Sequence, residues 1–251
     1  MTTQDMNSSH PAWRFVSALA LFLALTVGPA HALTVPEKLI YELSWTGITA
    51  GTATQEIAEE KGLLRTVSTA RSADWLSVFY PIEDRIETTL SRTPSSHLGQ
   101  PLHYHMHISE GKHRRDREIN FDSHLSKAYY KDNRSGEKAV VPINDKTYDI
   151  YSSFYYIRFA PLEVGKSVFV SIIDGKEAWN LEVQVVKKEK LKTKFGTMNT
   201  FLLKPMVRKE GVFENKGDVY IWVSDDERRL PVKVQVKVVI GSITGTLVEV
   251  R

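Results

Sequence analysis

Short runs of alternating apolar and polar residues fill most of this chain and constrain its fold more than any other feature. The clearest run follows the turn at Asp174-Gly175, where Trp179, Leu181, Val183 and Val185 alternate with other residues. A period of two is typical of a strand that buries one face, and a two-residue turn with glycine is typical of a hairpin. Similar runs recur from residue 39 to residue 250, so the sequence predicts a mainly β protein of about a dozen antiparallel strands.

One stretch in the middle of the chain departs from this alternation. Between Tyr148 and Arg158 the apolar residues Ile150, Phe154 and Ile157 recur at the spacing i, i+4, i+7, which gives one apolar stripe along a helix. The stripe is widened by two flanking tyrosines, Tyr151 and Tyr155. We therefore predict one short amphipathic helix in a protein otherwise built of strands.

The residues around this helix predict where it begins and ends. The carboxylate of Asp149 can accept the free backbone N–H groups of the first turn. Pro161 ends the helix because proline has no N–H and its ring clashes with the preceding turn. A sheet of this length must curve and its concave face must be filled, so we expect Phe154 and Ile157 to be buried against it. The predicted fold is a single strongly curved antiparallel sheet or an open barrel, with the helix packed in or across it.

Three other stretches are predicted to connect strands. The bulky residues from Trp75 to Tyr80, before Pro81, predict a short helical turn or a bulged corner. Ser, Gly and Pro residues predict a loop over residues 94–101. The charged residues 187–190 predict a turn between two separate strands.

The N-terminal 32 residues have the three parts of a secretory signal peptide. A polar start that carries Arg14 is followed by an apolar run over residues 15–27 and by Ala30-His31-Ala32, an A-x-A cleavage site. The alternative is a membrane anchor, but the run is shorter than the roughly 20 residues that a helix needs to span a bilayer. We predict cleavage between Ala32 and Leu33, a single exported domain over residues 33–251, a periplasmic location and no integral membrane segment in the mature chain.

The charge balance and the absence of cysteine narrow the class of protein. Lys and Arg total 33 against 30 Asp and Glu, and removal of residues 1–32 takes away one base and one acid, so the net charge stays at +3. A balance this close to neutral argues against a general nucleic-acid binder. Without cysteine no disulfide can form, so an exported domain must be stable through its own hydrophobic core.

Several short segments together resemble a known family. They are Ile48-Thr-Ala-Gly51, Phe79-Tyr-Pro-Ile-Glu-Asp84, Glu110-Gly-Lys112 with Arg114-Arg115, Asp149 with Ser152-Ser153 and Tyr155-Tyr-Ile-Arg158, Gly196-Thr-Met198, and Trp222-Val-Ser-Asp-Asp226 with Arg229-Leu-Pro-Val232. In this combination the chain resembles the bacterial exported proteins grouped as domain of unknown function 3108. The resemblance implies an exported β-rich domain and supplies no activity. The predicted build is also similar in architecture to the periplasmic lipoprotein and lipid carriers, a likeness that is weak as an argument for function.

Three histidines alternate on one expected strand. His103, His105 and His107 project to the same side, and neighbours in this set lie roughly 6.6 Å apart along the strand. One such pair could hold zinc or copper if a neighbouring strand supplied a third ligand. The alternative is a solvated polar face, which we favour because the sequence has no cysteine and no helical H-E-x-x-H motif. We therefore predict no cofactor and no tight metal site at these histidines.

The aromatic residues and one arginine are the candidate ligand-binding residues. Aromatic side chains can line an apolar or sugar-stacking pocket or can form core. The candidates for such a pocket are Tyr151, Tyr155, Tyr156, Arg158 and Trp179. Arg158 ends a mostly apolar helix, and we expect it to pair inside the fold with a carboxylate, with Asp84 or Glu83 as candidate partners.

The sequence lacks the common enzyme signatures. It contains no G-x-S-x-G, no P-loop and no dinucleotide-binding fingerprint. We therefore predict a periplasmic, non-enzymatic β protein that binds an apolar or amphiphilic component of the cell envelope, such as a lipid or a glycan-bearing lipid. A structural or interaction module without a ligand cavity is the main alternative, and an enzyme acting on envelope glycan is a third.

Overall fold

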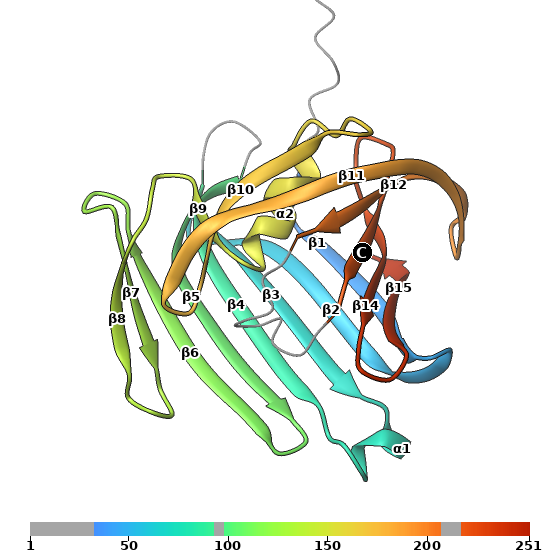
Figure 1. Ribbon diagram of the computed structural model, residues 1–251, viewed down its shortest axis with the longest axis horizontal. Coiled ribbons are helices and arrows are strands. Elements are labelled where there is room, and N and C mark those ends of the chain that lie inside the picture. Colours follow the sequence, from blue (N-terminus) through green and yellow to red (C-terminus); the bar gives the residue numbers. More distant parts are fainter. Residues whose placement is uncertain (1–32, 93–97, 207–216) are drawn as a thin grey trace, which may run out of the picture. The chain divides into compact units, whose positions relative to one another are not determined.

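The computed structural model describes residues 33–92, 98–206 and 217–251, and the predicted signal peptide lies outside these ranges. The described chain forms one sheet of 15 strands and two short helices (Figure 1). This confirms the prediction of a mainly β protein with a curved sheet, although the strands are more numerous than the predicted dozen.

The strands of the first half are β1 (Glu37–Trp45), β2 (Ile48–Glu60), β3 (Leu63–Ser72), β4 (Glu83–Arg92), β5 (Leu98–Glu110), β6 (His113–Asp122), β7 (Lys127–Asp132) and β8 (Lys138–Pro142). Those of the second half are β9 (Thr147–Asp149), β10 (Ser167–Asp174), β11 (Glu177–Thr193), β12 (Gly196–Pro205), β13 (Val219–Ser224), β14 (Pro231–Lys237) and β15 (Ser242–Val250). Helix α1 (Asp74–Ser77) lies between β3 and β4, and helix α2 (Ser152–Phe159) lies between β9 and β10.

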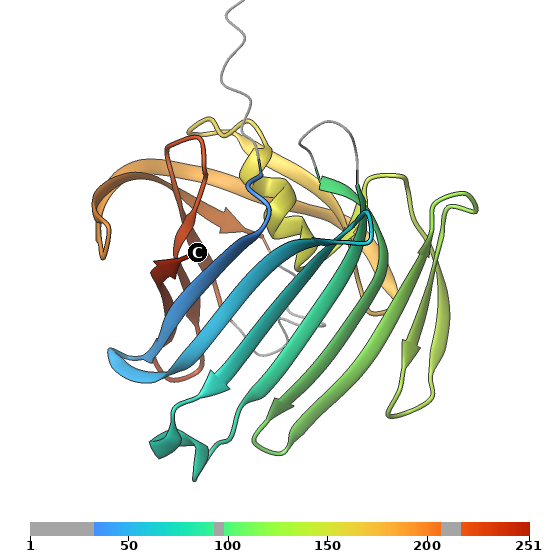
Figure 2. The same ribbon diagram turned by 180° about the vertical axis from the view of Figure 1, so that it is seen from behind.

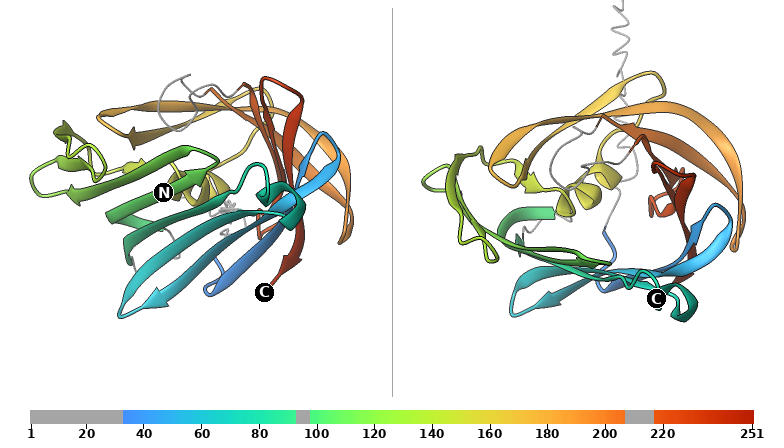
Figure 3. Two further views of the ribbon diagram at one scale, coloured as in Figure 1. Left: turned by 90° about the horizontal axis from the view of Figure 1, so that it is seen from below. Right: turned by 60° about the horizontal axis from the view of Figure 1, so that its bottom comes forward.

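The topology is almost entirely sequential. Strands consecutive in the chain pair with each other except β8 and β9, β1 also pairs with β15, and the order across the sheet runs from β8 through β1 and β15 to β9. All the described pairs are antiparallel except β9 with β10, which is parallel. Among the described strands, β8 and β9 are the two edges of the sheet, so the barrel is open. Figures 2 and 3 show the sheet curving around α2.

Two strand boundaries differ from the sequence-based expectation. Residues 187–190 are not a turn, because β11 continues through them and pairs with β12 as far as Thr193↔Gly196. Residues 98–101 belong to β5 rather than to a loop, while residues 94–97 of that expected loop lie outside the described part. In both places the composition was misleading. The charged residues of β11 lie on an exposed strand face, and the proline of β5 lies at a bulge, so both stretches had the composition of a connection.

The position of one turn and the exposure of one residue also differ from the prediction. The hairpin turn after β10 consists of Gly175 and Lys176, since Asp174 pairs with Glu177. On β5, Tyr104, Met106 and Ile108 are buried as the alternation predicts, whereas Leu102 is 38% exposed. The pairing with β4 shifts register just there, and this irregularity turns Leu102 away from the core.

The start and the end of α2 follow the predicted residues. The Asp149 carboxylate accepts the backbone N–H groups of Tyr151 and Ser152, both at 3.0 Å. The helix nevertheless begins only at Ser152, because Tyr148 and Asp149 belong to β9. At the other end Ala160 is extended, as the residue before a proline is expected to be, so Pro161 ends the helix as predicted.

The burial of α2 is broader than the predicted apolar stripe. Ile157 is 6% exposed and Ile150 is 3% exposed, as expected, but Phe154 is only partly buried and that prediction was wrong. The buried residues of the helix are Ser152, Ser153, Tyr155, Ile157 and Arg158. A helix enclosed by a curved sheet contacts it on more than one side, so one stripe does not describe its buried surface.

The largest cluster of buried residues joins the two halves of the sheet through α2. It includes Ile57 and Leu90 from the first half, Val183 and Ile221 from the second half, and Tyr155 from the helix between them. A second cluster lies mainly on β4 to β8, with Ile173 from β10, and includes Tyr104, Met106 and Ile119. A third lies on β1 and the strands near the C-terminal end of the chain. The helix thus fills the concave face, as the fold requires.

Candidate ligand-binding site beside α2

Arg158 is buried in an ion pair at the end of α2. Its guanidinium donates to both carboxylate oxygens of Glu37, at 2.7 and 3.0 Å, and also to the backbone carbonyls of Arg228 and Arg229, each at 3.0 Å. The side chains of Arg158 and Glu37 are 5% and 3% exposed. The expected pairing with a carboxylate inside the fold is therefore correct, but the partner is on β1 and is neither Asp84 nor Glu83.

Two of the candidate tyrosines belong to the core and not to an open pocket. Tyr155 is 5% exposed and Tyr151 is partly buried, and burial in the apolar interior raises the pKa of both hydroxyls. The cavities that touch Tyr155 have volumes of only about 20 and 10 Å³. A water molecule fits in such a space but a lipid chain does not. These tyrosines therefore belong to the packed interior around α2.

An open pocket lies at the C-terminal end of α2 and contains the third candidate tyrosine. Its volume is about 270 Å³. The lining residues come from the start of β5, from β9 and its preceding loop, and from the end of the helix: Leu98, Lys146, Tyr148, Tyr156, Phe159, Ala160 and Pro161. One lysine and six apolar or aromatic residues therefore form a site with a single charged group. We refer to it as the α2 pocket.

Two tyrosines and the lysine give the α2 pocket its polarity. The rings of Tyr148 and Tyr156 pack against each other with 5.1 Å between their centroids. Burial raises the pKa of Tyr148 to about 12, so its hydroxyl stays protonated at neutral pH. Lys146 is exposed at this pocket, where its ammonium group can meet an anionic head group. The pocket thus combines an apolar wall with one cation.

The remaining candidate, Trp179, lines a different pocket of about 310 Å³. Polar residues make up much of that lining, including Asn144, Thr147, Ser171 and Asn180. Successive residues of a strand point to opposite faces, so Thr147 of β9 lines this pocket while Tyr148 lines the α2 pocket. The five predicted ligand-binding residues are therefore not brought together: only Tyr156 lines the α2 pocket, and sequence reasoning missed Lys146.

The three histidines of β5 do not act as one set. His105 and His107 each contact Asp116 of the neighbouring strand, at 3.0 and 3.3 Å, whereas His103 lies opposite Asn120. Sequence reasoning missed Asp116 and its neighbour Glu118. The turn at Gly111-Lys112 was a usable signal, because a tight hairpin there fixes which residues face each other across the two strands.

An open, curved sheet wound around a helix is a β-barrel-like architecture, and a solved structure shares it. The crystal structure of a beta-barrel-like protein of domain of unknown function DUF1849 from Brucella abortus aligns with a TM-score of 0.53. The alignment covers 87% of this chain and 98% of that chain at 9% sequence identity, so the likeness concerns the fold alone.

The particular family follows from the sequence. Residues 40–248 match the family described as protein of unknown function DUF3108, and the chain belongs to this family. The search of curated proteins finds no match. In the described ranges, neither helix combines the length and the hydrophobicity that a membrane-spanning helix needs.

Proposed function

We propose that this protein is exported to the periplasm and, without catalysing a reaction, binds an apolar or amphiphilic component of the cell envelope in the α2 pocket. The observation that carries the proposal is the composition of this pocket, in which Lys146 is the one charged residue beside an aromatic and aliphatic wall. Export rests on the signal-peptide pattern of residues 1–32.

The size of the pocket sets the class of ligand. Pockets that enclose a small molecule measure roughly 300–1,000 Å³, and the α2 pocket, at about 270 Å³, lies just below that range. A whole lipid with two acyl chains is too large for it. We expect the pocket to hold one end of an amphiphile, with an acidic head group near Lys146 and an apolar segment against Tyr148 and Phe159.

Native mass spectrometry of protein purified from the periplasm tests both parts of the proposal. The expected mass corresponds to a chain that begins at Leu33, with an additional bound species that is released by organic solvent. A chain that keeps its first 32 residues, or one recovered only with membranes, would contradict export.

Titration with the fluorescent fatty acid cis-parinaric acid tests the site directly. Lys146→Glu should weaken binding by up to about fivefold, the equivalent of about 1 kcal/mol for an exposed charge pair. The matched control is Lys190→Glu, since Lys190 is also exposed but lies on β11 and outside the pocket. Absence of saturable binding to the wild-type protein, or equal loss in both variants, would refute the α2 pocket as the binding site.

The second candidate function is a structural or interaction module of the envelope. It is favoured by the exposed apolar residues around α1, where Trp75, Val78 and Phe79 are 47%, 77% and 82% exposed. Apolar groups gathered in this way on a surface are typical of a contact site for another molecule. A protein that binds no amphiphile in the titration would support this second function.

A further inference from the structure

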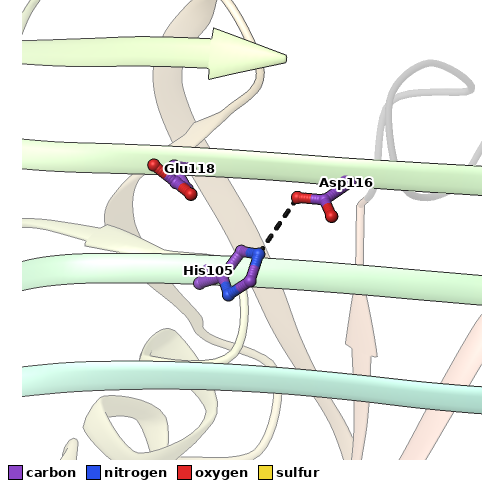
Figure 4. A group of neighbouring side chains, drawn as sticks. All are labelled: His105, Asp116 and Glu118. Atoms are coloured by element: carbon purple, nitrogen blue, oxygen red, sulfur yellow. Dashed lines mark hydrogen bonds and ion pairs between the residues drawn. The ribbon is translucent and has the colours of Figure 1, made fainter. Parts of the chain in front are cut away.

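The antiparallel pairing of β5 and β6 gathers titratable side chains on one face of the sheet. His105 lies directly opposite Glu118, and His107 lies directly opposite Asp116. The other face of the same strands carries buried core residues such as Met106 and Ile119, so this group faces away from that core. His105, Asp116 and Glu118 point toward one another in Figure 4.

The three ligand atoms of this group lie close enough together to be brought to one small metal ion. His105, Asp116 and Glu118 each offer one ligand atom, and these three atoms lie within 4.8 Å of one another. Ligand atoms about 2.1 Å from a tetrahedral zinc ion lie about 3.4 Å apart. Small side-chain rotations therefore bring the imidazole nitrogen and two carboxylate oxygens onto one ion. All three residues are partly buried, which limits the freedom that binding would remove.

Neighbouring residues hold Asp116 in place. The Nδ1 atom of His107 lies 3.3 Å from its Oδ2 atom, on the side away from His105. The Asn133 amide donates to Asp116 Oδ1 and to Glu118 Oε1, both at 2.8 Å, and so holds the two carboxylates together. Carboxylates fixed in this way by second partners are typical of metal sites, where such partners orient the ligands.

Charged residues on the neighbouring strands β4 and β7 lie next to the group. Glu87 lies opposite His105 on the β4 side, but its carboxylate is already paired with Arg65 and Arg85. Lys131 lies opposite Glu118 on the β7 side. The carboxylates of Asp116 and Glu118 therefore remain the acidic groups that face His105 from β6.

We propose that His105, Asp116 and Glu118 form a binding site for one divalent transition-metal ion of the zinc class, with His107 as a residue that positions Asp116. One imidazole and two carboxylates are a donor set that zinc accepts, whereas calcium and magnesium prefer oxygen ligands alone. This departs from the expectation based on the histidines alone, because the carboxylates come from a strand that the histidine pattern did not include. The proposal does not depend on the α2 pocket.

Calorimetric titration of the purified, untagged protein with Zn²⁺, after removal of metals with a chelator, tests the site. We expect one ion per chain and at least tenfold weaker binding in both His105→Ala and Glu118→Gln. His103→Ala is the matched control, since it removes a histidine from the same face of the same strand and should change the affinity less than twofold. The thermal midpoint of the wild-type protein should also rise with Zn²⁺, because a ligand bound to the folded state stabilises it.

Two results would overturn the proposal. One is the absence of saturable Zn²⁺ binding by the wild-type protein. The other is an equal loss of affinity in His103→Ala and His105→Ala, which would mean that the ion binds to exposed histidines in general. Melting curves without metal establish whether each variant is folded, and Glu118→Gln keeps the test decisive if His105→Ala does not fold.

Discussion

The two helical segments of this protein are both rich in aromatic residues but lie in opposite environments. The α1 segment contains Trp75, Val78, Phe79 and Tyr80, and no residue of the helix itself is buried. The α2 segment is just as rich in aromatic residues, yet five of its eight helical residues are buried. Phe79 is 82% exposed, whereas Tyr155 is 5% exposed. Amino-acid composition therefore does not decide which of the two helices enters the core.

The strand pairing on either side of each helix explains the difference. Helix α1 joins β3 and β4, which are antiparallel neighbours, so the chain only has to reverse at the end of the sheet. Helix α2 joins β9 and β10, which are parallel, so the chain has to return along the sheet before the second strand can begin. A returning connection packs on a face of the sheet, while a reversing connection projects from its end.

The largest expected effect comes from removing Arg158, which tests whether the end of α2 is buried. Arg158→Ala leaves Glu37 as an unpaired charge in the interior, which should lower the free energy of unfolding by about 3–5 kcal/mol. Lys176→Ala, which breaks the exposed pair with Glu137, should leave the free energy of unfolding nearly unchanged. Urea unfolding measures both. Equal effects of the two substitutions would show that the Arg158 ion pair is not buried as described.

Aliphatic truncation compares the two helices themselves. Ile157→Ala in α2 should cost about 2–5 kcal/mol, because it opens a cavity in the largest core cluster. Val78→Ala, at the end of α1, should stay within about 0.5 kcal/mol because that side chain is 77% exposed. Thermal melting resolves the difference, and a large loss at Val78 would mean that another part of the protein covers α1.

The pH dependence of stability tests the environment at the start of the buried helix α2. Burial raises the pKa of Asp149 at the start of α2, although hydrogen bonds from Ser152 oppose the shift. Because the folded-state pKa is above the unfolded value of about 3.9, the free energy of unfolding should fall as pH rises from about 4 through the raised pKa. Asp149→Asn keeps an oxygen acceptor for the backbone and removes this ionisation, so the fall should disappear. Unfolding in urea between pH 4 and pH 7 provides the measurement.

The sequence predicted the local elements better than their partners. Alternation identified the strands, and Asp149 and Pro161 correctly marked the region of the helix, because these signals depend on residues close together in the chain. Arg158 was correctly expected to be paired, but Glu37 lies 121 residues away. Only the order of strands across the sheet brings that carboxylate to the helix.

The two candidate sites differ in how far they could be predicted from the sequence, because they combine residues at different distances along the chain. The α2 pocket combines the start of β5, the loop before β9 and the end of α2, and no short sequence pattern joins Leu98 to Tyr156. The group around Asp116 is more local, since one hairpin sets its register. Its detection required the carboxylates of the return strand to be considered together with the histidines.

The pairing of β1 with β15 also has a consequence for how the chain reaches its final structure. It links residues near opposite ends of the described chain, and Lys38 and Arg251 exchange two backbone hydrogen bonds of 2.9 Å. Strand β1 is synthesised long before β15, so one side of β1 stays an open hydrogen-bonding edge until the rest of the sheet exists. Contacts this distant in sequence form slowly, and an exposed strand edge can pair with another molecule in the meantime. A chain interrupted before residue 242 would keep two such edges, on β1 and on β14, and would be prone to aggregate rather than fold.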